Sequence, residues 1–203
     1  MDAHLRAGIA VYNAGRYHAA HDAWEDYWLD LEAGDDERFL HGLIQFTAVV
    51  HHASTGNWSG AQGLAESAGT YLAPLPEDYR GVNLDVVRPY LARVASDPEH
   101  AERVAPPPLT HDGVAVDYEA LDFDATAVAA AVLAEADGYD EGDVKRAVGY
   151  ARGELDDRGE GTFVGLLFSF VREGEKRPMV AERLAAHVAR ERQKDDDVRG
   201  LFD

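Results

Sequence analysis

Apolar side chains recur every three or four residues along most of this chain of 203 residues, which is the period of an amphipathic helix. Residues 17–31 carry the most aromatic stripe, with Trp24 and Trp28 one turn apart. Residues 39–53 are apolar nearly all round, as in a helix at the middle of a bundle. With capping residues and helix stops, the spacing predicts helices over residues 4–14, 17–31, 35–53, 57–72, 84–95, 124–136, 140–155, 162–171 and 178–188. The predicted fold class is all-α.

Turn-forming residues divide these helices into two groups. Residues 97–116 include the run Pro106–Pro108 and other residues typical of turns and linkers. The sequence therefore predicts a helical bundle over residues 1–96, a proline-rich linker over 97–116, and a smaller helical unit over 117–203 packed against the bundle. A short extended piece at 114–116 is the one strand that the pattern indicates.

The composition is strongly acidic, with 38 Asp and Glu against 19 Lys and Arg and a formal net charge of −19. Carboxylates spread over a surface keep a protein hydrated where salt shortens charge interactions to about 3 Å at 1 M. We therefore expect a halophilic protein of haloarchaeal type, whose acidity says nothing about its substrate. The charge argues against a nucleic-acid partner, because phosphate binding needs clustered Lys and Arg.

Cysteine is absent, so a metal site would need His, Asp or Glu ligands. The first residues contain no basic region followed by an apolar stretch, so we expect no signal peptide. The most apolar run, 39–50, is much shorter than the roughly 20 residues that span a bilayer. We expect a cytoplasmic protein with no membrane partner, and a homo-oligomer remains open.

Polar side chains interrupt the apolar stripes of the second and third predicted helices. His21 lies on the stripe of residues 17–31, with Glu25 one turn later, and Gln45 and His51 lie in the third helix. A buried amide or imidazole without a hydrogen bond costs on the order of 1–3 kcal/mol, so we expect these groups to meet. The candidate ligand or pocket residues are Tyr17, His21, Trp24, Glu25, Trp28, Gln45 and His51.

This cluster allows two interpretations. In one, a closed hydrogen-bond network fixes how the two helices pack. In the other, His21, Glu25 and His51 converge on a divalent metal ion or a polarised water, because imidazole and carboxylate groups four residues apart on a helix can reach one point. A metal-activated water would attack an ester, an amide or a phosphate. The other histidines of these helices are expected at the surface or at partly exposed ends: His18, His41 and His52.

A group of short motifs resembles a known family, DUF309, over about residues 4–95. The motifs are Asn13–Trp28 (NAGRYHAAHDAWEDYW), Gly42–Gln45 (GLIQ), His51, Gly56-Asn57, Gly60-Ala61 and Pro76–Gly81 (PEDYRG). Asp22 stands where the family usually has Glu, so we expect Asp22 to be neither ligand nor base. The resemblance implies a small helical protein without an established function. Residues 97–203 have no counterpart in the family pattern.

The motifs that are absent exclude several enzyme classes. No Glu-x-x-His, His-Glu-x-x-His or glycine-rich phosphate loop occurs, which argues against ferritin-like di-iron sites, zincins and the usual nucleotide hydrolases. We prefer a non-enzymatic helical binding or interaction module with its polar cluster between the second and third helices, and we predict no cofactor. The alternative is a metal-assisted hydrolase that uses His21, Glu25 and His51 with a divalent ion.

Overall fold

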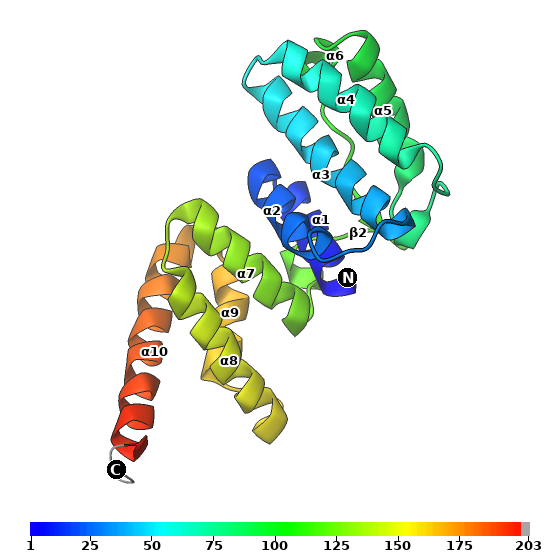
Figure 1. Cartoon of the computed structure of the whole chain (residues 1–203). Coiled ribbons are helices and arrows are strands. Elements are labelled where there is room, and N and C mark those ends of the chain that lie inside the picture. Colours follow the sequence, from blue (N-terminus) through cyan, green and yellow to red (C-terminus); the bar gives the residue numbers. More distant parts are fainter. Residues whose placement is uncertain (200–203) are drawn as a thin grey trace. The chain divides into compact units, whose positions relative to one another are not determined.

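A computed structural model describes residues 1–199, which form two compact units, one ending at Leu121 and the other beginning at Asp122 (Figure 1). Most of the described residues are helical and strands cover only four of them, so the all-α prediction is confirmed. No described helix is both long enough and apolar enough to span a bilayer.

The first unit is built around α3, which packs between α2 and α4. Ten of the 20 residues of α3 are buried, and they cover more than half of the helix circumference, which explains why so much of its sequence is apolar. The elements of this unit are α1 (Asp2–Asn13), α2 (Tyr17–Trp28), α3 (Asp35–Ser54), α4 (Trp58–Leu72), α5 (Leu84–Ser96), α6 (His100–Arg103), β1 (Thr110–His111), β2 (Val114–Ala115) and single 3-10 turns at Tyr79–Gly81 and Tyr118–Ala120.

The contact between α1 and α2 depends on one tryptophan. The side chain of Trp24 is fully buried, and its indole N–H donates to the backbone oxygen of Leu5 at 3.4 Å. The indole lies directly over Gly8, where an added Cβ would overlap the ring. Trp24 is therefore a core residue beneath α1, and the missing side chain at Gly8 is what allows the two helices to approach.

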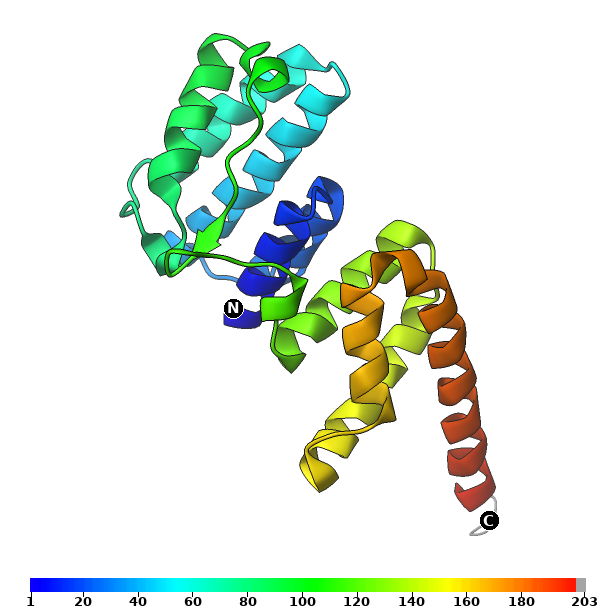
Figure 2. The ribbon, with the colours of Figure 1, turned by 180° about the vertical axis from the view of Figure 1, so that it is seen from behind.

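The proline-rich segment that the sequence assigns to a linker belongs to the first unit, which extends to Leu121. Two carboxamides hold its backbone: Asn13 bonds Leu109 N, Leu109 O and Val116 O at 2.8–2.9 Å. Asn83 bonds Pro108 O at 3.1 Å and Thr110 N at 2.8 Å. Figure 2 shows the segment after α6 running back along the unit. The predicted boundaries at 96 and 116 are therefore too early, because these long-range bonds leave no mark in the local sequence.

The second unit contains α7 (Phe123–Asp137), α8 (Glu141–Arg158), α9 (Thr162–Arg172), a 3-10 turn at Gly174–Lys176 and α10 (Arg177–Arg199), with α9 in contact with all three other helices. Two side chains from outside α9 satisfy its ends. The Glu154 carboxylate accepts from the N–H groups of Phe163 and Val164 at 2.8 and 3.1 Å. Arg177, buried to 6% exposure, donates to the carbonyl of Phe170 at 2.8 Å and pairs with Asp137 at 2.7 Å. Helix ends leave such groups unpaired, so these contacts define where α9 starts and stops.

Replacing Gly8 with Ala should destabilise the first unit by about 1–3 kcal/mol, because the new methyl group overpacks the site that Trp24 fills. The matched control is Gly63→Ala in the exposed interior of α4, where an added Cβ meets nothing within 4 Å. That change should be neutral or stabilising by up to about 1 kcal/mol, since alanine has the higher helix propensity. Denaturant unfolding followed by tryptophan fluorescence measures both. Equal effects of the two substitutions would contradict the packing described here.

In the second unit, Arg177→Met should cost about 1–3 kcal/mol, because it leaves the buried carbonyl groups of Phe170 and Val171 without the guanidinium that donates to them. Arg152→Met is the control, since Arg152 pairs with Asp124 at 3.5 Å with both side chains more than 60% exposed. An exposed pair of this kind contributes about 0–1 kcal/mol. Circular dichroism during unfolding measures the difference, and equal effects of the two substitutions would show that the buried guanidinium does not stabilise the unit.

Candidate functional site

Helices α2 and α3 run antiparallel, so the first turns of α2 lie beside the last turns of α3. At one end of the contact, Tyr17 and His21 of α2 face the same hollow as His51 of α3. At the other end, the Trp28 ring of α2 lies 4.6 Å from the ring of His41, near the start of α3. The polar residues expected between these helices are therefore distributed along a seam with two distinct ends.

The hollow at the first end is a histidine-lined depression of about 190 Å³. The ring of His18 has its centroid 6.2 Å from that of His21 and 6.1 Å from that of His51. Thr47 contributes to the floor, where its buried hydroxyl donates to the carbonyl of Ile44 at 2.7 Å. We refer to this depression as the histidine hollow; its lining residues are Tyr17, His18, His21, Thr47, Ala48 and His51.

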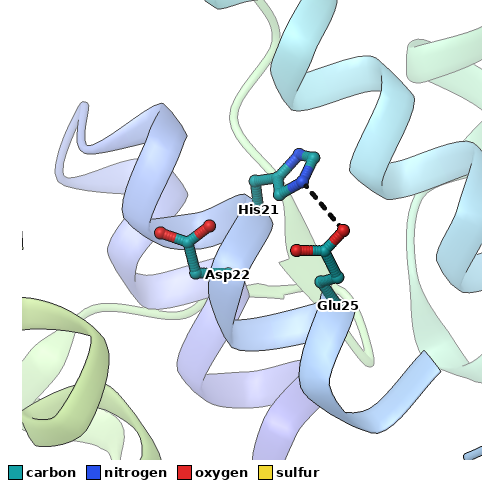
Figure 3. Close-up of side chains that lie close together, drawn as sticks. All are labelled: His21, Asp22 and Glu25. Carbon is teal, nitrogen blue, oxygen red and sulfur yellow. Dashed lines mark ion pairs between the residues drawn. The ribbon is translucent and has the colours of Figure 1, made fainter. Parts of the chain in front are cut away.

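Two carboxylates of α2 accompany its two imidazoles, each one helical turn later. The Nδ1 atom of His18 lies 3.1 Å from the Asp22 carboxylate, and the Nε2 atom of His21 lies 3.6 Å from that of Glu25. Figure 3 shows the His21 ring turned toward Glu25, with the Asp22 carboxylate to the left of that pair. Ligand atoms of His21, Asp22 and Glu25 lie within 4.8 Å of one another, so these three could hold a metal ion.

The two members of the predicted cluster on α2 remain open to solvent. The side chain of His21 is 29% exposed and that of Glu25 is 44% exposed. A closed network would bury both and give each a short hydrogen bond, whereas the distance between them is 3.6 Å. This end of the seam therefore has the character of an accessible site.

Gln45 belongs to the other end of the seam, where its Nε2 atom lies 3.0 Å from the Nε2 atom of His41. His41 is held between the rings of Trp28 and Tyr71, at 4.6 and 4.1 Å. His41 Nδ1 and Gln45 Oε1 are buried without a hydrogen-bond partner, and the Glu37 carboxylate, 3.5 Å from His41 Nδ1, is too distant to supply one. His41, whose side chain is 22% exposed, thus takes the place beside Gln45 that the sequence predicts for His51.

Helix geometry accounts for the difference between the two histidines. Six residues separate Gln45 from His51, which is about 240° around a helix with 3.6 residues per turn, so the two side chains face different sides. His41 precedes Gln45 by four residues and shares its face. His18 and Asp22, which the sequence analysis left out of the candidate site, show the same four-residue spacing. That spacing was the available signal for both pairs.

The loop between α4 and α5 is tied to the start of α3 by a separate ion pair. Arg80 donates to both carboxylate oxygens of Asp36 at 2.8 and 2.6 Å, and the Tyr79 hydroxyl donates to the same carboxylate at 2.7 Å. The Arg80 guanidinium holds the pKa of Asp36 below its usual range. Arg80 takes a left-handed backbone conformation, with φ at 53°. This motif of the family pattern therefore braces a loop.

The comparisons with known proteins agree with the motifs. Residues 5–64 match the family model described as a domain of unknown function, DUF309. The predicted resemblance is confirmed over these residues, which include α2, α3 and the whole histidine hollow. An uncharacterized protein of Aquifex aeolicus (strain VF5) is 27% identical over 95 residues, or 47% of this chain. The match spans 28% of that protein's length.

The DUF309 match places the histidine hollow inside the matched segment, whereas the second unit lies wholly outside it. The PEDYRG run, Pro76–Gly81, also lies beyond the end of the family model. Within the matched segment, the histidine hollow gathers titratable side chains of two helices, α2 and α3, at a place open to solvent.

Glu25→Ala should change the free energy of unfolding by less than about 1 kcal/mol, because its pair with His21 is half exposed. Gln45→Ala is the comparison, because it removes the part-buried partner of the His41 Nε2 atom and should cost about 1–3 kcal/mol. Tryptophan fluorescence during denaturant unfolding measures both. A larger loss for Glu25→Ala than for Gln45→Ala would show that Glu25 belongs to a structural network after all.

Proposed function

We propose that the first unit is a non-enzymatic binding module that holds a divalent first-row transition-metal ion beside His21. The observation that carries this proposal is the approach of His21, Asp22 and Glu25, whose ligand atoms lie within 4.8 Å of one another next to a hollow. Imidazole and carboxylate donors suit Zn²⁺, Co²⁺ and Ni²⁺. The partial exposure of His21 and Glu25 supports a site that an ion can enter.

The acidity supports the further proposal that the protein works in a salt-rich cytoplasm. With a net charge of −19, the chain attracts any cation at low ionic strength. At about 1 M salt, screening limits such attraction to about 3 Å, so only direct coordination retains an ion. Selectivity for one metal must then come from nitrogen and oxygen ligands in contact with it, and binding should be measured under these conditions.

Titration calorimetry in about 1 M KCl should detect binding of Zn²⁺ or Ni²⁺, with Mg²⁺ giving no signal because imidazole is a poor ligand for it. His21→Ala should weaken Zn²⁺ binding by more than about tenfold. His187→Ala, which removes a histidine from the second unit, should leave the affinity unchanged. Failure of the wild-type protein to bind either ion, or equal affinities for the two variants, would refute the proposal.

A metal-assisted hydrolase is the second candidate, favoured by one observation: His51, its third predicted residue, lines the same hollow as His21. An ion with an open position there could activate water for attack on an ester or a phosphate. Zinc-loaded protein can be assayed with p-nitrophenyl acetate and bis(p-nitrophenyl) phosphate. If the protein binds the ion but is not an enzyme, the wild type and the His21→Ala variant hydrolyse these substrates at equal rates. A hydrolysis rate of the zinc-loaded wild type well above that of the His21→Ala variant would favour the hydrolase.

A further inference from the structure

We infer that the ion is held by three imidazoles, those of His18 and His21 on α2 and His51 on α3, and that Asp22 and Glu25 orient the two imidazoles of α2. This inference rests on the metal binding proposed above. It adds that the ion joins two helices, because one ligand comes from α3. The alternative ligand set, His21, Asp22 and Glu25, would lie on α2 alone.

The three rings lie near one another, at spacings wider than those of ligands on one tetrahedral ion. The centroids of His18 and His21 are 6.2 Å apart, and those of His18 and His51 are 6.1 Å apart. With Zn–N bonds of about 2.0–2.1 Å, two imidazoles on one ion have centroids about 5 Å apart at a tetrahedral angle. All three rings line the same hollow. Binding therefore requires the rings to approach by about 1 Å, and side-chain rotation is the movement that we propose, because His18 and His51 are exposed.

The two carboxylates occupy the positions of orienting groups. A histidine that binds a metal through one ring nitrogen usually donates its other N–H to a carboxylate or carbonyl, which sets the ring's orientation and basicity. The Nδ1 atom of His18 lies 3.1 Å from the Asp22 carboxylate, so His18 would bind the ion through its other ring nitrogen, Nε2. The Nε2 atom of His21 lies 3.6 Å from the Glu25 carboxylate, so His21 would bind the ion through Nδ1.

Three imidazoles leave one coordination position open in a tetrahedral site. They also suit a salt-rich solvent, because K⁺, Na⁺ and Mg²⁺ compete for carboxylates far more than for imidazoles. The expected ion is therefore Zn²⁺ or Co²⁺. Since binding involves α2 and α3 together, it should stabilise their packing in proportion to the logarithm of ion concentration.

The adjacent histidines His51 and His52 provide the decisive comparison. His51 lines the hollow, whereas the His52 ring is hydrogen-bonded to Asn57 at 2.8 Å on a different side of α3. In about 1 M KCl, His51→Ala and His18→Ala should each weaken Zn²⁺ binding by more than about tenfold, and His52→Ala should leave it unchanged. X-ray absorption of the zinc-loaded protein should count three imidazoles around the ion.

The outcomes separate this inference from the proposed function. One outcome is that the wild type binds Zn²⁺, that His21→Ala abolishes this binding, and that the His51→Ala and His52→Ala variants bind Zn²⁺ with equal affinity. The ligands then lie on α2 alone. That result refutes the three-imidazole site and leaves the proposed binding module standing. A single imidazole in the absorption spectrum would refute it likewise. If the wild-type protein binds none of Zn²⁺, Co²⁺ and Ni²⁺, both proposals fall.

Discussion

The burial of Trp24 over Gly8 is the contact on which the candidate site depends, because it sets the rotation of α2 about its axis. At about 100° per residue, His21 lies about 60° around the helix from Trp24, Glu25 about 100° and His18 about 120°. Their side-chain exposures rise in that order, at 29%, 44% and 75%, from a fully buried Trp24. One packed indole therefore turns these three side chains away from the core, whereas Asp22, about 160° from Trp24, is only 23% exposed.

The seam between α2 and α3 uses polar groups in two different ways along its length. Where Trp28 and Tyr71 enclose His41, the polar atoms are buried and incompletely paired, which is costly and demands well-defined packing. Where the hollow opens, imidazoles are paired with carboxylates at the surface and retain freedom to move. The interior end specifies how the helices meet, and the open end is where a ligand can be accommodated without disturbing that packing.

Side chains from other elements complete the backbone hydrogen bonding in both units. Asn13 and Asn83 hold the proline-rich segment against the first unit, and Glu154 and Arg177 satisfy the two ends of α9. A local cap begins α4, where the side chain of Asn57 accepts from Gly60 N, three residues later. At α9 the residue that precedes the helix, Gly161, has no side chain, and the carboxylate that accepts from Val164 N comes from the preceding helix.

The sequence by itself determined the helical class, the place of nearly every long helix, the DUF309 resemblance and the four-residue pairings such as His21 with Glu25. These follow from a period of 3.6 residues, which any local stretch of chain expresses. Only the tertiary structure decided that Trp28 and Tyr71 enclose His41, and that the first unit extends to Leu121. Those outcomes depend on how helices rotate and approach one another, and side-chain volumes at distant contacts set that geometry, which no local pattern records.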